Sequence, residues 1–380
     1  MTLKLTKKKR KRKTNPPAPA GPIPELSYKI LHDILLRLPV ESLLHCKAVC
    51  KAWRAIISDP IFIREQLHCS ASETEHNPWL IVTPHTLNSV IPTEHFGGEF
   101  RTVRFFAHCD GLVLVPTDTR LYLFNPATRE SITLPDGNRR GGMTCRCCAG
   151  LGLDPRTGKY KVVRAFYRSQ DPHSNMWTNM GMEVFTVSGN SGGGSWREIT
   201  DDLPYPAAIW HTGVMVNGFL FWHVARNRDA PWGLLHLNLA DETFGITDLP
   251  YSVNPEVRNN LFSLDELHGE LCVTSRTSDE TTIWTLPIGE GHEDGGQGDF
   301  WEKRCIVPIS GLFHPLAFLP GGRLMVSDSY TVSVYDMATT EMTTYEMDGL
   351  KYQGRRARKW KDIFIFNIHR YTESLVPISV

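Results

Sequence analysis

Three cysteines stand close together in the chain, and thiolates at this density could hold a zinc ion: Cys145, Cys147 and Cys148. A structural zinc site takes four ligands, which commonly come as paired C-x-x-C motifs or as one such pair followed by spaced histidines. The three cysteines have neither a paired C-x-x-C partner nor a histidine at ligand spacing. We therefore expect no metal here, and interpret these side chains as small buried apolar groups.

The chain carries no residue pattern typical of a catalytic site. No serine or cysteine nucleophile stands in a recognised motif, and neither H-E-x-x-H nor a phosphate-binding loop occurs. Its 15 histidines are dispersed. The sequence thus predicts a protein that is not an enzyme, holds no cofactor and acts through binding surfaces.

Size and composition indicate a soluble protein with more than one domain. The chain has 380 residues, of which 41% are hydrophobic and 22% charged, and it contains no run of eighteen apolar residues. Its first residues lack the apolar stretch of a secretory signal. Nine cysteines, an odd number without regular spacing, fit a reducing compartment better than a disulfide framework.

The start of the sequence is strongly basic. Residues 1–13 contain eight of the 41 Lys and Arg and no acid, which leaves 33 basic against 41 acidic residues in the rest of the chain. An acidic body offers little clustered positive charge to a phosphate backbone, so nucleic acid is not the expected partner. Charge repulsion and the prolines that follow predict a disordered tail and linker over residues 1–22.

A run of seven basic residues within this tail has two interpretations. It can be a nuclear localisation signal, or a solvated arm without a specific partner. We expect the signal, and therefore a nuclear protein with the cytoplasm as a second location. The run consists of Lys7, Lys8, Lys9, Arg10, Lys11, Arg12 and Lys13.

Helical periodicity begins after the tail. Leu26, Ile30, Ile34 and Leu38 recur at four-residue steps, as on one side of an amphipathic helix. The helix should end before Pro39, because the residue preceding a proline is pushed out of the α region.

Two shorter helices should follow, at residues 41–49 and 51–58, and Asp59 and Pro60 should stop the second of them. Three helices within residues 23–67 form so small a unit that they cannot bury all of their apolar side chains against one another. The remaining apolar surface must cover either the downstream domain or a separate partner.

The run IPELSYKILHDILLRLPVESLLHCKAVCKAWRAIISDPIF at residues 23–62 resembles the F-box. The F-box pattern has an opening Leu-Pro or Ile-Pro, a helix ending in I-L-x-x-L-P, and a helix containing V-C-K-x-W-R, and all three parts occur here in order. The resemblance implies that residues 23–67 dock onto a Skp-type adaptor, which a cullin holds in turn.

For individual residues, the resemblance implies an apolar adaptor-binding face with an aromatic anchor, as interface cores usually have. The residues expected on this face are Ile23, Pro24, Leu35, Leu38, Pro39, Leu43, Leu44, Val49, Cys50, Trp53 and Ile56.

From residue 75 to residue 380, short apolar runs alternate with Gly, Pro, Asn and Asp turns, which predicts an all-β domain. The strand candidates are rich in β-branched and aromatic residues, as pleated surfaces favour. They are GLVLV at 111–115, LYLF at 121–124, YKVVRAFY at 160–167, FLFWHVA at 219–225 and ELCVTS at 270–275.

One arrangement repeats along this domain: an apolar strand ends at a polar turn, and a second strand follows. Equivalent turn positions recur at intervals of 61, 52, 48 and 50 residues, namely at Asn125, Thr186, Asn238, Leu286 and Asp336. A period near fifty with about four strands per unit is typical of a kelch-like β-propeller blade. The expected fold is thus α plus all-β, with a three-helix F-box followed by a propeller of about six blades.

Several segments of this domain also resemble the F-box-associated domain of plant F-box proteins. They are DGLVLV, LFNPATRE, LGLDPRTGKYKVVR, VNGFLFWHV, the unit around Trp196 and the closing YTESLVPI. A rival reading comes from SGNSGGGSW at 188–196, which is close to the Asp-box of sialidase-type propellers. Its tryptophan is one place late and Asn replaces the Asp, so we interpret it as a Gly-rich connection.

Together the two resemblances imply the substrate-recognition subunit of a Skp/cullin/F-box ubiquitin ligase, whose propeller binds the protein to be ubiquitinated. The alternative is a non-degradative scaffold that uses the F-box only for docking. The sequence does not identify the substrate-binding residues; aromatic and arginine-bearing candidates are Trp177, Trp210 and the stretch Arg226 to Trp232.

Two strand-like segments are left over at opposite ends of the β domain, WLIVT at 79–83 and IFIFNI at 363–368. A propeller must join its first and last blades to avoid an exposed strand edge. We therefore expect these two segments to pair and to close the ring as part of a sixth blade.

Overall fold

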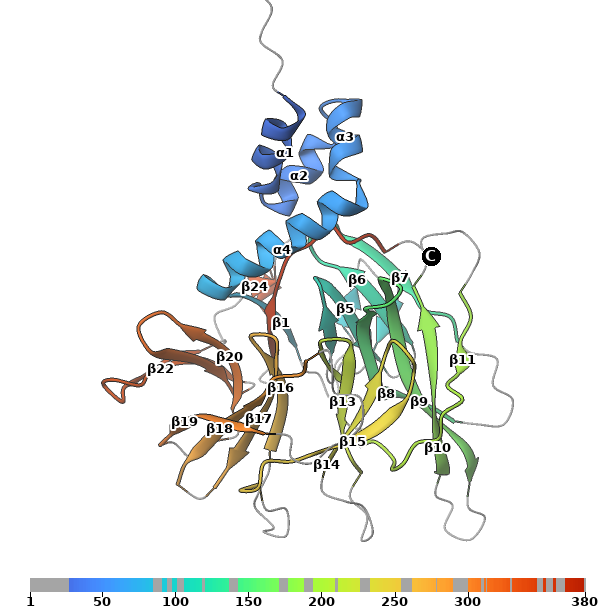
Figure 1. Cartoon of the computed structure of the whole chain (residues 1–380), viewed down its shortest axis with the longest axis vertical. Coiled ribbons are helices and arrows are strands. Elements are labelled where there is room, and N and C mark those ends of the chain that lie inside the picture. The colour runs from blue at the N-terminus through green and yellow to red at the C-terminus, as the bar shows by residue number, and fades with distance from the viewer. Residues whose placement is uncertain are drawn as a thin grey trace, which may run out of the picture.

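The computed structural model describes residues 27–84, 91–93, 98–100, 106–117, 120–136, 143–170, 177–187, 194–208, 211–225, 233–253, 262–277, 279–289, 300–308, 311, 313–328, 330–346, 351–352, 358–359 and 366–378. A group of helices stands on one end of a β-propeller (Figure 1). None of the described helices is long and apolar enough to cross a membrane.

In its described residues the helical unit contains four helices: α1 (Tyr28–Leu36), α2 (Val40–Cys46), α3 (Lys51–Ile57) and α4 (Pro60–His76). The first three lie where the sequence predicts them, but the prediction of only three helices was wrong. Asp59 and Pro60 end α3 and also begin α4, because the Asp59 carboxylate accepts a hydrogen bond from the Ile61 amide at 2.7 Å and Pro60 occupies the first helical turn.

The β domain is a propeller, as predicted, and its described residues form five four-stranded antiparallel sheets that stand below the helices (Figure 1). Their strands are β4 (Ala107–Cys109), β5 (Leu112–Pro116), β6 (Leu121–Asn125) and β7 (Glu130–Thr133) in blade 1; β8 (Met143–Asp154), β9 (Lys159–Gln170), β10 (Trp177–Thr186) and β11 (Arg197–Glu198) in blade 2; β12 (Val214–Val216), β13 (Phe219–His223), β14 (Gly233–Asn238) and β15 (Phe244–Asp248) in blade 3; β16 (Phe262–Leu267), β17 (Glu270–Arg276), β18 (Thr281–Leu286) and β19 (Glu302–Val307) in blade 4; and β20 (His314–Leu319), β21 (Arg323–Ser327), β22 (Thr331–Asp336) and β23 (Met342–Glu346) in blade 5. The five strand candidates named from the sequence coincide with β5, β6, β9, β13 and β17.

A sixth, two-stranded sheet joins the two ends of the β domain. Strand β1 (Trp79–Pro84) pairs antiparallel with β26 (Phe366–Tyr371), with Trp79 opposite Tyr371. The predicted pairing is confirmed, although residues 363–365 of the expected segment lie outside the described residues. Two further pairs of short strands are β2 (Ile91–Thr93) with β3 (Gly98–Phe100) and β24 (Lys351–Tyr352) with β25 (Arg358–Lys359).

The repeat inferred from the sequence has a direct structural counterpart. Asn125, Thr186, Asn238, Leu286 and Asp336 are each the last residue of the third strand of a blade, so the predicted equivalence is confirmed. At three of these positions the side chain accepts a hydrogen bond from the amide two residues later, at 2.9 to 3.0 Å. Asn and Asp form such turns readily, which explains why the repeat could be recognised from short stretches of the sequence.

The turns between first and second strands form a second repeat. Two successive residues have positive φ in four blades, at Asp110–Gly111, Asn217–Gly218, His268–Gly269 and Gly321–Gly322. In the first three the pair forms the whole connection, as in the type I′ turn, which joins paired strands with their natural twist and favours Asn-Gly and Asp-Gly. In blade 5 the loop also contains Pro320.

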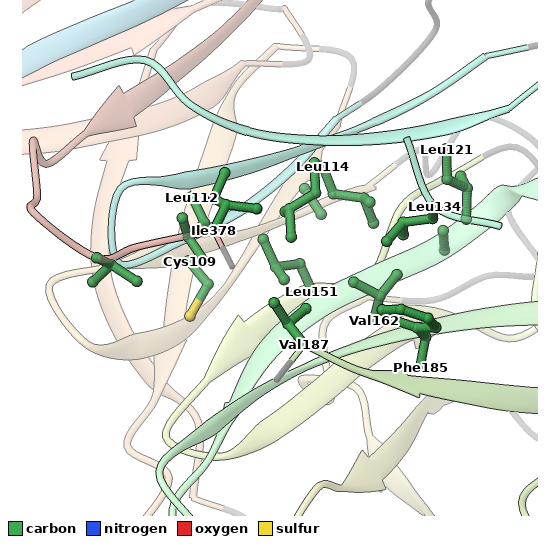
Figure 2. Packing of buried hydrophobic residues seen from close by; sticks show 14 residues of the cluster. Cys109, Leu112, Leu114, Leu121, Leu134, Leu151, Val162, Phe185, Val187 and Ile378 are labelled. Atoms are coloured by element: carbon green, nitrogen blue, oxygen red, sulfur yellow. The ribbon is translucent and has the colours of Figure 1, made fainter. Parts of the chain in front are cut away.

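The apolar core is divided into clusters between neighbouring blades. Figure 2 shows the cluster between blades 1 and 2, in which Leu112 and Leu114 pack near Leu151, Val162 and Phe185. Of the three adjacent cysteines, Cys148 is buried in the next cluster, as an apolar residue would be, while the side chains of the other two lie outside the described residues. Among the described side chains, no group of three His, Cys, Asp or Glu could hold a metal ion.

Candidate functional site

The helical unit has its own small core, and three residues predicted to contact an adaptor belong to it. Leu35, Leu43 and Ile56 are buried together with Val40 and Phe62. Direct contact with a partner is therefore the wrong role for these three side chains, because they offer almost no surface. They hold the helices together from inside the small core.

Six other predicted residues retain surface. Pro39, Val49 and Cys50 are exposed, and 63% of Val49 is accessible. Leu38, Leu44 and Trp53 are half-buried against the helical core. Ile23 and Pro24 precede the first described residue.

Sequence reasoning missed two exposed apolar residues on α1. Ile30 and Ile34 are 50% and 47% exposed, although their four-residue spacing predicted a packed helix face. The side chains that pack inward from α1 are instead Leu31, Leu35 and Leu36. The predicted apolar stripe thus exists, but part of it lies on the surface of the helical unit. Exposed apolar patches often mark sites of protein interaction.

Helix α4 joins the two domains. Phe62 near its start packs into the core of the helical unit, whereas Ile63 and Leu67 pack against the cluster between blades 1 and 2. Figure 1 shows α4 between the other helices and the propeller. It runs through residues 68–74, which the sequence had left between the two predicted domains, so the described chain has no loose linker there.

Under α4 the central channel of the propeller opens into a cavity of about 1660 Å³. It is lined by Arg64 and Leu67 of α4 and by residues of the first strands of several blades, together with β26. A polar layer crosses this cavity, composed of His108, Asp265, His314 and His369.

Two opposite electrostatic effects act on the histidines of this layer. Burial disfavours the charged form of His314, but the carboxylate of Asp265, 3.0 Å from its Nδ1, outweighs burial and raises the pKa of His314. Burial lowers the pKa of His108 and, together with the neighbouring His108 ring, lowers the pKa of His369 well below its ordinary value. The surroundings therefore favour the charged form of His314 beside Asp265 and the neutral forms of His108 and His369.

The far end of the propeller carries the connections from second to third strands and from fourth to first strands, because first-to-second turns lie under α4. The substrate candidates Trp210 and Arg226–Trp232 belong to such connections but lie outside the described residues, as does the side chain of Trp177. Two described tyrosines of the same class of connection, Tyr251 and Tyr330, are 89% and 54% exposed. Sequence reasoning missed them because single aromatic residues in loops give no periodic signal.

Two family models match the chain. The F-box domain matches residues 23–65, and the F-box associated beta propeller domain matches residues 65–370.

Similar proteins come from the plant Arabidopsis thaliana. The F-box protein CPR1 is 29% identical over 281 residues, which cover 64% of this chain and 65% of that protein. A putative F-box protein is 26% identical over 331 residues, covering 82% of this chain and 86% of the relative. Another putative F-box protein is 25% identical over 381 residues, covering 92% and 90%. The chain thus spans slightly less than two thirds of the length of CPR1 but most of the other two.

Proposed function

The chain belongs to the F-box proteins that carry an F-box associated β-propeller domain, and from this premise we propose that it is the substrate-recognition subunit of a Skp/cullin/F-box ubiquitin ligase. The observation that supports this proposal most is that two different kinds of exposed surface lie at opposite ends of the molecule. An apolar surface that no other described residue covers lies on the F-box helices, and exposed aromatic residues lie in connections at the far end of the propeller.

The F-box implies a Skp-type adaptor as partner, and we assign the adaptor-binding face to the exposed apolar residues of α1 and of the α2–α3 connection. Pro39, Val49 and Cys50 would enter the interface core, Trp53 would serve as a half-buried anchor, and Ile30 and Ile34 would extend the contact along α1. Interface cores of this kind are apolar, and a few well-packed side chains carry most of the affinity. A cullin would be reached through the adaptor.

Proteins of this family are non-catalytic subunits, so the contribution of this chain is proximity. A separate ubiquitin-conjugating enzyme would carry the thioester, and the receptor would hold a substrate lysine close to it. Tethering raises the effective concentration of one reactant near the other without adding any catalytic group.

We place the substrate-binding surface at the far end of the propeller. Rigid scaffolds usually present recognition residues on loops, and exposed tyrosines such as Tyr251 and Tyr330 are suited to protein contacts. The basic run at residues 7–13 would bring the complex into the nucleus.

Affinity purification with and without proteasome inhibition tests this proposal. A receptor should retain more partner when the proteasome is blocked, and a variant that cannot bind the adaptor should retain equally high levels without the inhibitor. If the amount of co-purified partner changes neither with the inhibitor nor with the loss of adaptor binding, the chain is a non-degradative scaffold. A deletion of residues 23–62 would remove every buried member of the helical core except Leu375 and leave that side chain uncovered, so the surface substitution Val49→Asp is the cleaner variant.

A further inference from the structure

The segment that follows β26 leaves the ring of blades and passes between blade 1 and the F-box helices. In Figure 1 it is the dark red chain that rises beside β1 and crosses below α3 towards the C-terminus. We refer to its residues Glu373–Ile378 as the strap.

On the helical side, the strap completes both the core and a helix end. Leu375 is buried in the F-box core beside Leu43, Ile57 and Phe62. Helix α2 has Pro39 at its N-cap, whose side chain cannot accept a hydrogen bond, and the Glu373 carboxylate accepts one from the Val40 amide at 2.9 Å instead. A carboxylate is the favoured charge at a helix N-terminus.

On the propeller side, three hydrogen-bonding residues hold the backbone of the strap. The Asn125 amide nitrogen donates to the carbonyl oxygens of Ser374 and Val376, at 3.0 and 2.9 Å. The Ser374 hydroxyl donates to the Asp110 carbonyl at 2.6 Å, and the Ile378 amide donates to the Glu130 carboxylate at 3.0 Å.

Apolar packing and a tight turn reinforce these bonds. Ile378 lies beside Leu112 in the cluster between blades 1 and 2 (Figure 2), which also includes Val376. The strap runs so close to the type I′ turn of blade 1 that a Cβ on Gly111 would lie 2.5 Å from the Ser374 hydroxyl. Only glycine fits this position, both for space and for its φ of 79°.

Three segments singled out in the sequence therefore meet at one place. DGLVLV supplies Asp110 and Gly111, LFNPATRE supplies Asn125 and Glu130, and YTESLVPI is the strap itself. Asn125 has two tasks, since its oxygen closes the turn after β6 while its nitrogen holds the strap.

We propose that the strap fixes the orientation of the F-box on the propeller, with Glu373 and Leu375 as positioning residues for ubiquitin transfer. Helix α4 belongs to the helical unit and also contacts the propeller, because Ile63 and Leu67 pack against the cluster between blades 1 and 2 and the helix contacts β20 of blade 5. The strap adds a second attachment on another helix, α2, next to the adaptor-binding residue Pro39. The consequence for ubiquitin transfer rests on the proposed function, whereas the mechanical role does not.

The test compares Leu375→Ala and Glu373→Ala in the full chain with Pro377→Ala, an exposed position of the same strap. We expect Leu375→Ala to raise amide hydrogen exchange in α2 by at least about tenfold, because it removes the buried contact. Glu373→Ala should raise it chiefly at the first turn of α2. Small-angle scattering should show a wider distribution of interdomain distances for both variants, and exchange in blades 3 to 5 should not change.

Pro377→Ala should match the unchanged protein in both measurements. Unaltered exchange and scattering in both strap variants would overturn the proposal, since α4 would then suffice. An increase of exchange throughout the propeller would also overturn it, because the strap would then be a general stability element. Adaptor binding by the unchanged chain is measured separately, so its absence would refute the proposed function and leave the result on the strap intact.

Discussion

Replacing Val49 by aspartate should separate adaptor binding from folding. Val49 is 63% exposed and lies between α2 and α3, so in the free protein the change places a charge in water and should alter the free energy of unfolding by less than about 0.5 kcal/mol. In the complex, the same side chain would be covered. Losing the burial of its exposed part costs about 1 to 2 kcal/mol, and an unpaired carboxylate in an apolar interface adds a cost of at least similar size.

The expected total of about 3 kcal/mol corresponds to a loss of adaptor affinity of more than about a hundredfold. Titration calorimetry with the purified adaptor measures it, and thermal unfolding by circular dichroism checks that the helices remain folded. Tyr330→Asp is the matched control, since Tyr330 is 54% exposed but lies at the far end of the propeller. Adaptor affinity within about threefold of the unchanged protein for Val49→Asp would refute the assignment of this face. Trp53→Ala is a poorer choice, because Trp53 also packs on the F-box core.

Three further outcomes are expected. Ending the chain at Lys359 removes β26 and leaves β1 unpaired, so the protein should become insoluble or lose cooperative melting, whereas a melting curve like that of the intact chain would refute closure by β1 and β26. Deleting residues 7–13 should shift a fluorescent fusion towards the cytoplasm; an unchanged distribution would make the run a solvated arm. The melting temperature should fall between pH 7.5 and 5.5, because the pKa values of His108 and His369 are lowered in the folded state, and their contribution is present above the ordinary pKa of 6.5 and lost as pH falls. Because the pKa of His314 is raised, its contribution to stability depends on pH in the opposite direction. His369→Gln should therefore make the melting temperature fall less as pH decreases, and a steeper fall would contradict this account.

The parts of the fold that the sequence predicted are those encoded by local chemistry. Asn125, Asn238 and Asp336 close their own turns with side-chain oxygens, and this need for Asn or Asp repeats once per blade. The pairing of β1 with β26 was predictable for another reason, namely that a propeller has to join the two ends of its ring of blades. Helix α4 was missed because Asp59-Pro60 can end one helix and begin the next, and only the second role was overlooked.

The sequence placed the residues expected on the adaptor-binding face in one group and did not separate the buried ones from the exposed ones. Leu43 and Val49 are both aliphatic and six residues apart, yet the first is buried and the second is exposed. Their types cannot distinguish these roles, because side-chain burial depends on how α2, α3 and α4 pack, and on Leu375 from the other end of the chain. The same holds for Ile30 and Ile34, whose spacing fits a helix face equally well whether the chain itself or a partner covers it.

The strap shows why interdomain geometry is the least predictable part of such a receptor and the part on which its action depends. Its contacts join residues 249 and 333 positions apart, so no local pattern marks them. Under the proposed function, a substrate lysine would be useful only within reach of the conjugating enzyme, and that reach would be set by the angle between the proposed adaptor-binding face and the far end of the propeller. A binding assay on either surface would not detect a change in this angle. Attachment through both α4 and α2 would therefore matter for the transfer step even where it adds nothing to the affinity of either partner.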